Sequence, residues 1–151
     1  MKRWLLPGIM ATLATALLFA LLASGTSTIV ASTSVASTAF VLFAAPASLA
    51  ARPWNTLMGH LLGLGAGLLV LPLAGLGVPP AIPYSLSVGA SVALMQWARA
   101  SHPPAAGTAL TVPAAHYHGG FTSTMAIVLL LTVAGLLLVQ RPVRKYLPAE
   151  E

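Results

Sequence analysis

Acidic residues are almost absent from this sequence. Its 151 residues contain two Asp or Glu side chains, and these are the last two positions, Glu150 and Glu151. Cation pores and proton-coupled pumps usually carry carboxylates along the path of the ion. The chain before Glu150 offers none, so any bound ligand is expected to be anionic or neutral. The alternative is that a small protein embedded in lipid simply avoids charge.

Cysteine is absent, and charged residues make up only 6% of the chain. The first absence excludes disulfides and thiolate metal sites. Soluble domains carry about 25% charged residues, whereas this chain is 58% apolar with a mean hydropathy of +0.91. It cannot cover itself with polar groups. We therefore expect a single all-α domain over residues 1–151, a polytopic helix bundle whose first partner is the lipid bilayer. No metal, cofactor or nucleic acid is expected.

Five hydrophobic runs are long enough to suggest membrane helices. They cover approximately residues 4–23, 29–45, 54–78, 84–98 and 121–139. The first run follows Lys2 and Arg3 and also resembles a secretory signal peptide. We favour a retained helix, because this run is longer than a usual signal core and the chain after it is also membrane-like.

The segment RASHPPAAGTALTVPAAHYHGG, residues 99–120, decides the number of crossings. Basic residues collect on the cytoplasmic side of membrane proteins. All seven basic residues lie on that side only if residues 103–115 also cross the membrane. The basic residues are Lys2, Arg3, Arg52, Arg99, Arg141, Arg144 and Lys145. We therefore predict six crossings with both termini cytoplasmic, in what we expect to be a bacterial cytoplasmic (inner) membrane.

The fifth crossing should be unusual. Thirteen helical residues reach only about 20 Å, against a hydrocarbon core of about 30 Å. We expect a short or broken helix after His102-Pro103-Pro104, completed by extended backbone in HYHGG, residues 116–120. Such backbone is tolerated at membrane depth only where protein or water shields it, which is typical of a pore or binding site.

Two small-residue patterns indicate where helices meet. Gly59, Gly63 and Gly67 recur every four residues, which predicts close approach to a neighbouring helix. Hydroxyl-rich positions on the second run share one helical face with Val41, at i, i+3, i+4 and i+7 spacing. They are Ser34, Ser37 and Thr38. Their hydroxyls either bond to helix backbone or line a polar path.

Three blocks resemble the HPP family of integral membrane proteins, named for a His-Pro-Pro motif. They are STSVASTAFVLFAAP (residues 32–46), RPWNTLMGHLLG (52–63) and HPPAAGTAL (102–110). The chain departs from the family pattern at Ala36, Thr38, Trp54 and Met58, and Gly107 is displaced by one position. The resemblance implies four membrane helices, fewer than the six that the basic residues and apolar runs predict. It also implies nitrite transport, to which photosynthetic members are linked.

These observations predict a site for a small oxyanion at the cytoplasmic ends of the helices. Arginine and imidazole groups can hold an oxyanion, and helix starts offer free N–H groups. The residues expected to contact the anion are Ser34, Thr38, Asn55, His60, Arg99 and His102, and those expected to shape the motif are Gly59, Pro103, Pro104 and Gly107. Alternatively, Arg52 and Arg99 are topological anchors, and His60 and His102 are buried structural residues.

His116 and His118 are expected on the opposite side, in an interfacial belt with Tyr117 rather than as metal ligands. An enzyme is not expected, because no Gly-Ser nucleophile elbow is present and no carboxylate could orient a histidine. Two functions stay open. One is a transporter or channel for a nitrite-like monovalent anion, and the other is a non-transporting structural or interaction module. Assembly into a homo-oligomer is also open.

Overall fold

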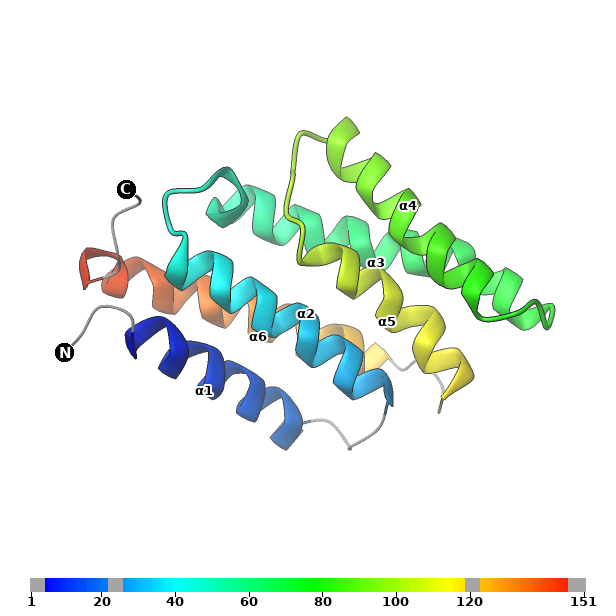
Figure 1. Ribbon diagram of the computed structural model, residues 1–151, viewed down its shortest axis with the longest axis horizontal. Helices are drawn as coiled ribbons and strands as arrows, with labels where there is room; N and C mark the ends of the chain where they lie inside the picture. Colours follow the sequence, from blue (N-terminus) through cyan, green and yellow to red (C-terminus); the bar gives the residue numbers. More distant parts are fainter. Residues whose placement is uncertain (1–4, 22–25, 119–122, 147–151) are drawn as a thin grey trace.

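The computed structural model describes residues 5–21, 26–118 and 123–146, and every regular element in these ranges is helical. The elements are α1 (Leu5–Leu21), α2 (Thr26–Ala44), the 3-10 turn η1 (Leu49–Ala51), α3 (Pro53–Gly75), α4 (Ala81–Trp97), α5 (Ala105–Tyr117), α6 (Ser123–Val143) and η2 (Arg144–Tyr146). Successive α-helices run in opposite directions along the bundle (Figure 1). The start of α1 and the end of α6 consequently lie at the same end.

The fold confirms an all-α bundle of six helices with a short fifth one. α5 is a single helix of 13 residues and runs in the same direction as α1 and α3. By length and composition, the residues Pro53–Gly75 and Ser123–Pro142 are able to span a membrane by themselves, while α1 and residues 28–44 of α2 form shorter apolar helices. The prediction of extended backbone at residues 116–120 is wrong for residues 116 and 117. His116 and Tyr117 are the last residues of α5, and residues 119–120 lie outside the described ranges.

α5 occupies the middle of the bundle, packed against α2, α3 and α4. Its buried positions occur all around the helix, as expected for an element enclosed by others. They are Ala105, Thr108, Ala109, Thr111, Val112, Pro113, Ala114 and Ala115. Most of these side chains are small, which allows the neighbouring helices to approach closely. Because α5 is enclosed by protein, its shortness does not expose unpaired backbone groups to lipid.

The closest approach is between α3 and α5, along the glycine stripe predicted from the sequence. A Cβ at Gly59 would lie 2.7 Å from the Cβ of His102, and a Cβ at Gly63 would collide with the Ala105 carbonyl oxygen. At Gly67 a Cβ would lie 2.6 Å from the Ala109 carbonyl oxygen. Each separation is too short for a side chain, so only glycine fits at these three positions.

α2 separates two interiors of different character. Ser34 and Thr38 lie toward α5 and α3, where they make polar contacts. Other positions of α2 join an apolar core formed with α1 and α6, and these are Ala31, Val35, Ala39, Leu42 and Phe43. Gln140 ties α6 to this helix by donating from Nε2 to the Leu42 carbonyl oxygen at 2.9 Å. The polar side of α2 is thus directed into the half of the bundle that contains α5.

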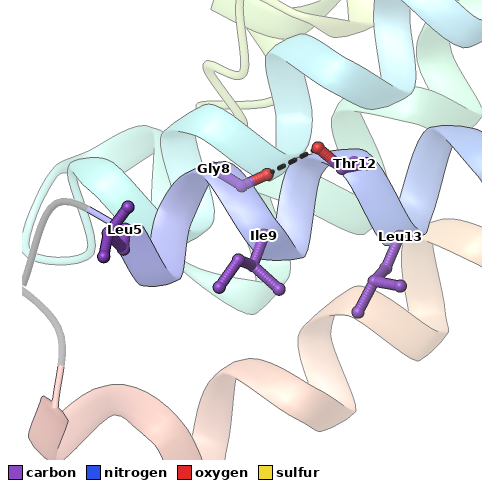
Figure 2. Close-up of a pocket in the computed structure, with 5 residues that line it drawn as sticks. All are labelled: Leu5, Gly8, Ile9, Thr12 and Leu13. Atoms are coloured by element: carbon purple, nitrogen blue, oxygen red, sulfur yellow. Dashed lines mark hydrogen bonds between the residues drawn. The ribbon is translucent and has the colours of Figure 1, made fainter. Parts of the chain in front are cut away.

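The outer surface is apolar. Leu5, Ile9 and Leu13 recur at every fourth position on α1, and all three are exposed (Figure 2). The Thr12 hydroxyl on the same helix donates to the Gly8 carbonyl oxygen at 3.0 Å, which satisfies it without water. In an aqueous setting such a surface would aggregate, whereas in a bilayer it faces hydrocarbon.

The glycine stripe generates the first prediction. Gly63→Ala should destabilise the protein by about 1–3 kcal/mol, because the new methyl group forces α3 away from the Ala105 carbonyl. Gly65→Ala is the matched control, since a Cβ there meets nothing within 4 Å and alanine has the higher helix propensity. Thermal unfolding in detergent measures both. Equal melting temperatures for the two variants would show that the close approach of α3 and α5 is not what stabilises the fold.

Candidate functional site

Two histidine rings meet in the interior of the bundle. His60 comes from the second turn of α3, and His102 comes from the connection between α4 and α5. Their ring centroids are 5.1 Å apart and the ring planes are inclined by 55°. Neither side chain has any exposed surface. Buried polar rings need hydrogen-bond partners, and all four ring nitrogens have one.

Thr38 of α2 stands between the two rings. Its Oγ1 lies 2.9 Å from Nε2 of His60 and 3.2 Å from Nε2 of His102. The same hydroxyl lies 2.9 Å from the carbonyl oxygen of Ser34, one turn earlier on α2. A single hydroxyl therefore joins α2, α3 and the connection between α4 and α5.

The other ring nitrogens extend the network in two directions. Nδ1 of His102 donates to the Ala50 carbonyl oxygen at 2.7 Å, which fixes this nitrogen as protonated. Nδ1 of His60 lies 2.7 Å from the Thr108 hydroxyl of α5. That hydroxyl lies 2.7 Å from Ser34 Oγ, which in turn lies 2.8 Å from the Pro104 carbonyl oxygen. We call Ser34, Thr38, His60, His102 and Thr108 the histidine–hydroxyl cluster.

Backbone contacts hold the two histidines in place. Asn55 Nδ2 donates to the Ser101 carbonyl oxygen at 3.2 Å, which ties the first turn of α3 to the segment before His102. The Thr56 hydroxyl donates to the Ala50 carbonyl oxygen at 3.1 Å, the same oxygen that His102 uses. The start of α3 and the segment that carries His102 therefore form one unit.

The His-Pro-Pro motif makes the turn that starts α5. The Ala105 N–H donates to the His102 carbonyl oxygen at 2.9 Å, and Pro104 is already helical, with φ −55° and ψ −27°. Pro103 and Pro104 have no N–H to leave unpaired at a helix start. Gly107 lies against α2, where a Cβ would come 3.2 Å from the Cβ of Ser34. The motif thus orients His102 toward His60, and Gly107 brings Ser34 close to α5.

Five of the six residues expected to contact an anion lie in or beside this cluster. Ser34, Thr38, His60 and His102 belong to it, and Asn55 lies next to it through Ser101. The hydroxyl face of α2 and the histidine pair, which the sequence presents as separate features, are one cluster. Ser37 is the exception on that face, because it is exposed and its hydroxyl donates to Thr33 of its own helix.

Arg99 does not join the cluster. It is exposed at the end of α4 and has a φ of +51°, in the left-handed region that favours glycine. The Ala100 N–H donates to the Met95 carbonyl oxygen at 2.9 Å, which closes the end of α4 in the manner of a Schellman turn. An arginine in this position strains the backbone, at a cost to stability.

Sequence reasoning missed Thr108 and the Ala50 carbonyl. Thr108 is an isolated hydroxyl in an alanine-rich helix, where threonine usually bonds its own backbone. Its only sequence signal is its place in the block HPPAAGTAL. The role of Ala50 belongs to its main chain, so no side-chain pattern could reveal it.

The remaining histidines lie at the other end of α5. His116 and His118 are exposed, and the Tyr117 hydroxyl donates to the Val78 carbonyl oxygen at 2.7 Å. Tyr117 also stacks edge-on against Tyr84 of α4, with ring centroids 5.9 Å apart. This aromatic contact ties α5 to α4 and to the turn after α3. The two histidines are separate from the buried cluster.

The cluster joins the three blocks in which the sequence resembles a known family. The family model described as "HPP, transmembrane region" matches residues 1–147. The chain belongs to the HPP transmembrane family. Searches of curated proteins and of solved structures find no match. In this HPP protein the histidine of the His-Pro-Pro motif is a buried ring that bonds to α2 and to the turn before α3.

The cluster is chemically unusual because it is polar without a carboxylate. It contains three hydroxyls and two imidazoles, and each of these groups can both donate and accept hydrogen bonds when the rings are neutral. Such groups can bind an anion by donation, pass a proton, or lock helices together. In all three cases the direction of each hydrogen bond depends on the orientation of a hydroxyl.

Thr38 provides the second prediction. Thr38→Val keeps the shape of the side chain but removes the hydroxyl between the rings, and should cost about 1–3 kcal/mol because both Nε2 atoms lose their buried partner. Thr33→Val is the matched control on the same helix, since Thr33 is exposed and bonds only to the Ile29 carbonyl. It should change stability by less than about 0.5 kcal/mol. Thermal unfolding that gives equal losses for both variants would contradict this role of Thr38.

Proposed function

We propose that this HPP membrane protein moves a small monovalent anion, of the nitrite type, across the bilayer. The observation that carries the proposal is a buried polar cluster of imidazole and hydroxyl groups, in a chain with no Asp or Glu before Glu150. A carboxylate in the interior would repel an anion and attract a cation. Imidazole N–H, hydroxyl and amide groups can instead replace part of the hydration shell of an oxyanion. The proposal assigns no catalytic role to these groups.

A surface hollow next to the cluster supports access from outside the bundle. It is lined by Ser37, Phe40 and Val41 of α2 and by Pro103 and Pro104. Ser37 is adjacent in sequence to Thr38, and the Pro104 carbonyl oxygen contacts the Ser34 hydroxyl.

Arg99 is proposed to attract the anion rather than to bind it in the interior. It precedes His102 by three residues and is exposed at the bundle end where α5 begins. A positive charge at the mouth of a narrow path raises the local anion concentration and the rate of entry. The presence of arginine at a position that favours glycine is consistent with this use.

The proposed orientation places that end of the bundle in the cytoplasm, in a bacterial inner membrane. Arg52, Arg99, Arg141 and Arg144 are exposed on elements that begin or end there, as the positive-inside rule requires. Trp54 and Trp97 are 58% and 83% exposed at the same end. Tryptophan is enriched at the membrane–water interface, so these two rings would lie at the level of the lipid headgroups.

Cysteine labelling tests this orientation, since the chain contains no cysteine of its own. Ala47→Cys lies between α2 and α3, and Leu76→Cys lies at the other end of α3; both positions are exposed. A membrane-impermeant maleimide should label Leu76→Cys in right-side-out vesicles and Ala47→Cys in inside-out vesicles. Labelling of both positions from one side would refute a crossing by α3, and the reverse pattern would refute the orientation.

Transport is tested with purified protein in liposomes. We expect a nitrite-dependent current whose reversal potential follows the nitrite gradient and is unaffected by Na⁺ or K⁺ gradients. Arg99→Gly should lower the current severalfold while leaving the fold equally or slightly more stable, by up to about 1 kcal/mol, because left-handed strain is relieved. Arg141→Gln, a neutralisation at the end of α6, is the matched control and should retain more of the current.

The competing function is a non-transporting structural module, favoured by the mutual satisfaction of the cluster's hydrogen-bonding groups. A protein that inserts and unfolds normally but carries no anion current would support this module and refute transport. A reversal potential that follows Na⁺ or K⁺ would refute both the anion selectivity and its explanation by the missing carboxylates.

A further inference from the structure

The histidine–hydroxyl cluster has more short contacts than protons to fill them when both rings are neutral. Seven contacts connect its members to one another and to three carbonyl oxygens. A neutral cluster has five protons for these contacts, one on each of three hydroxyls and one on each ring. Two of the seven contacts are therefore without a proton in the neutral state.

Five protons can fill the seven contacts in more than one way, and in one such neutral arrangement Thr38 donates to His102. Nδ1 of His102 must carry its proton, because the Ala50 carbonyl oxygen can only accept. Its Nε2 is then an acceptor and takes the proton of Thr38. The Thr38 oxygen accepts from Nε2 of His60, so Nδ1 of that ring accepts from Thr108.

The remaining hydroxyls complete this chain. Thr108 has given its proton to His60, so its oxygen accepts from Ser34. In this arrangement the two contacts without a proton are those from Thr38 to the Ser34 carbonyl and from Ser34 to the Pro104 carbonyl. Both of these carbonyl oxygens are acceptors only, and both already lie at hydrogen-bonding distance from a hydroxyl.

Added protons would fill these two contacts without moving heavy atoms. When Nε2 of His102 gains a proton, Thr38 accepts from it and turns its own proton to the Ser34 carbonyl, 2.9 Å away. When Nδ1 of His60 gains a proton, Thr108 turns to Ser34, and Ser34 turns to the Pro104 carbonyl, 2.8 Å away. Each hydroxyl that turns can donate its proton to an oxygen already within hydrogen-bonding distance.

We propose that the histidine–hydroxyl cluster is a proton-binding site that holds one proton, shared between His60 and His102 through Thr38. Either ring can take up the proton if the hydroxyls rotate and no heavy atom moves. The proton can also pass between the rings through Oγ1 of Thr38. In that transfer, Nε2 of one ring gives its proton to Oγ1, and Oγ1 gives its own proton to Nε2 of the other ring. A second proton is opposed because the ring centroids are only 5.1 Å apart in the protein interior.

In the part of the chain that the structure describes, no other titratable or charged side chain points into the cluster. On the elements packed around it, Arg52 and Arg99 are exposed, and Tyr84 and Tyr117 stack on each other at the other end of α5. No carboxylate precedes Glu150, so no acid competes for the proton. The proposal is independent of anion transport, since proton binding can be measured whether or not an anion crosses.

The test uses nitrogen NMR of 15N-histidine protein in lipid bilayers. The chain has four histidines, and His116→Gln with His118→Gln removes the two exposed ones, so every remaining signal comes from the cluster. Between about pH 8 and about pH 4, which spans the ordinary titration range of histidine, we expect one imidazolium per chain. The signals of both rings should shift together, because they share the proton.

Two hydroxyl variants in the same background isolate the role of Thr38. Thr38→Ser keeps the hydroxyl and should preserve the shared titration, while Thr38→Val should leave the two rings titrating separately. Rings that both stay neutral to about pH 4 with the fold intact by circular dichroism would overturn the proposal. Two protons bound independently in the protein with Thr38 would also overturn it. If Thr38→Val does not fold, the test rests on the protein with Thr38 and on Thr38→Ser, in both of which the two ring signals should shift together.

Discussion

A single hydroxyl placed between two buried imidazoles is the contact on which the arrangement of this bundle depends. Thr38 lies within hydrogen-bonding distance of Nε2 of both His60 and His102. The two rings come from chain segments that are far apart in sequence, and the hydroxyl comes from a third. Because unpaired polar groups are costly in a medium without water, these three segments must stay together, and the packing around them follows from this constraint.

The short helix α5 and the glycine stripe of α3 both serve this contact. His102 reaches the interior because the helix after it begins three residues later and is enclosed by α2, α3 and α4. Gly59 allows the Cβ of His102 to lie against α3, and Gly63 admits the Ala105 carbonyl one turn farther on. Larger residues at these positions would separate α3 from α5 and pull the rings apart. The apolar core of α1, α2 and α6 supports α2 from its other side.

The sequence predicted the helical class, the six helices and the shortness of α5, because these follow from apolar run lengths and from the distribution of basic residues. It also identified His60, His102, Ser34 and Thr38, through motif spacing and helical periodicity. It could not predict that Thr38 bridges the two rings, since this depends on how α2 is rotated against α3. The contribution of Ala50 is a main-chain carbonyl, and the Tyr117 hydroxyl at the end of α5 donates to the distant main-chain carbonyl of Val78. Such tertiary contacts leave no periodic signal.

A double-mutant cycle tests most directly whether Thr38 and His60 act as one unit. Free energies of unfolding are measured for Thr38→Val, for His60→Leu and for the double variant. Because each single change already removes the contact between the two groups, the double variant should lose less than the sum of the two, by about 1 kcal/mol or more. Losses that add within about 0.5 kcal/mol would contradict the account, since independent residues behave in that way.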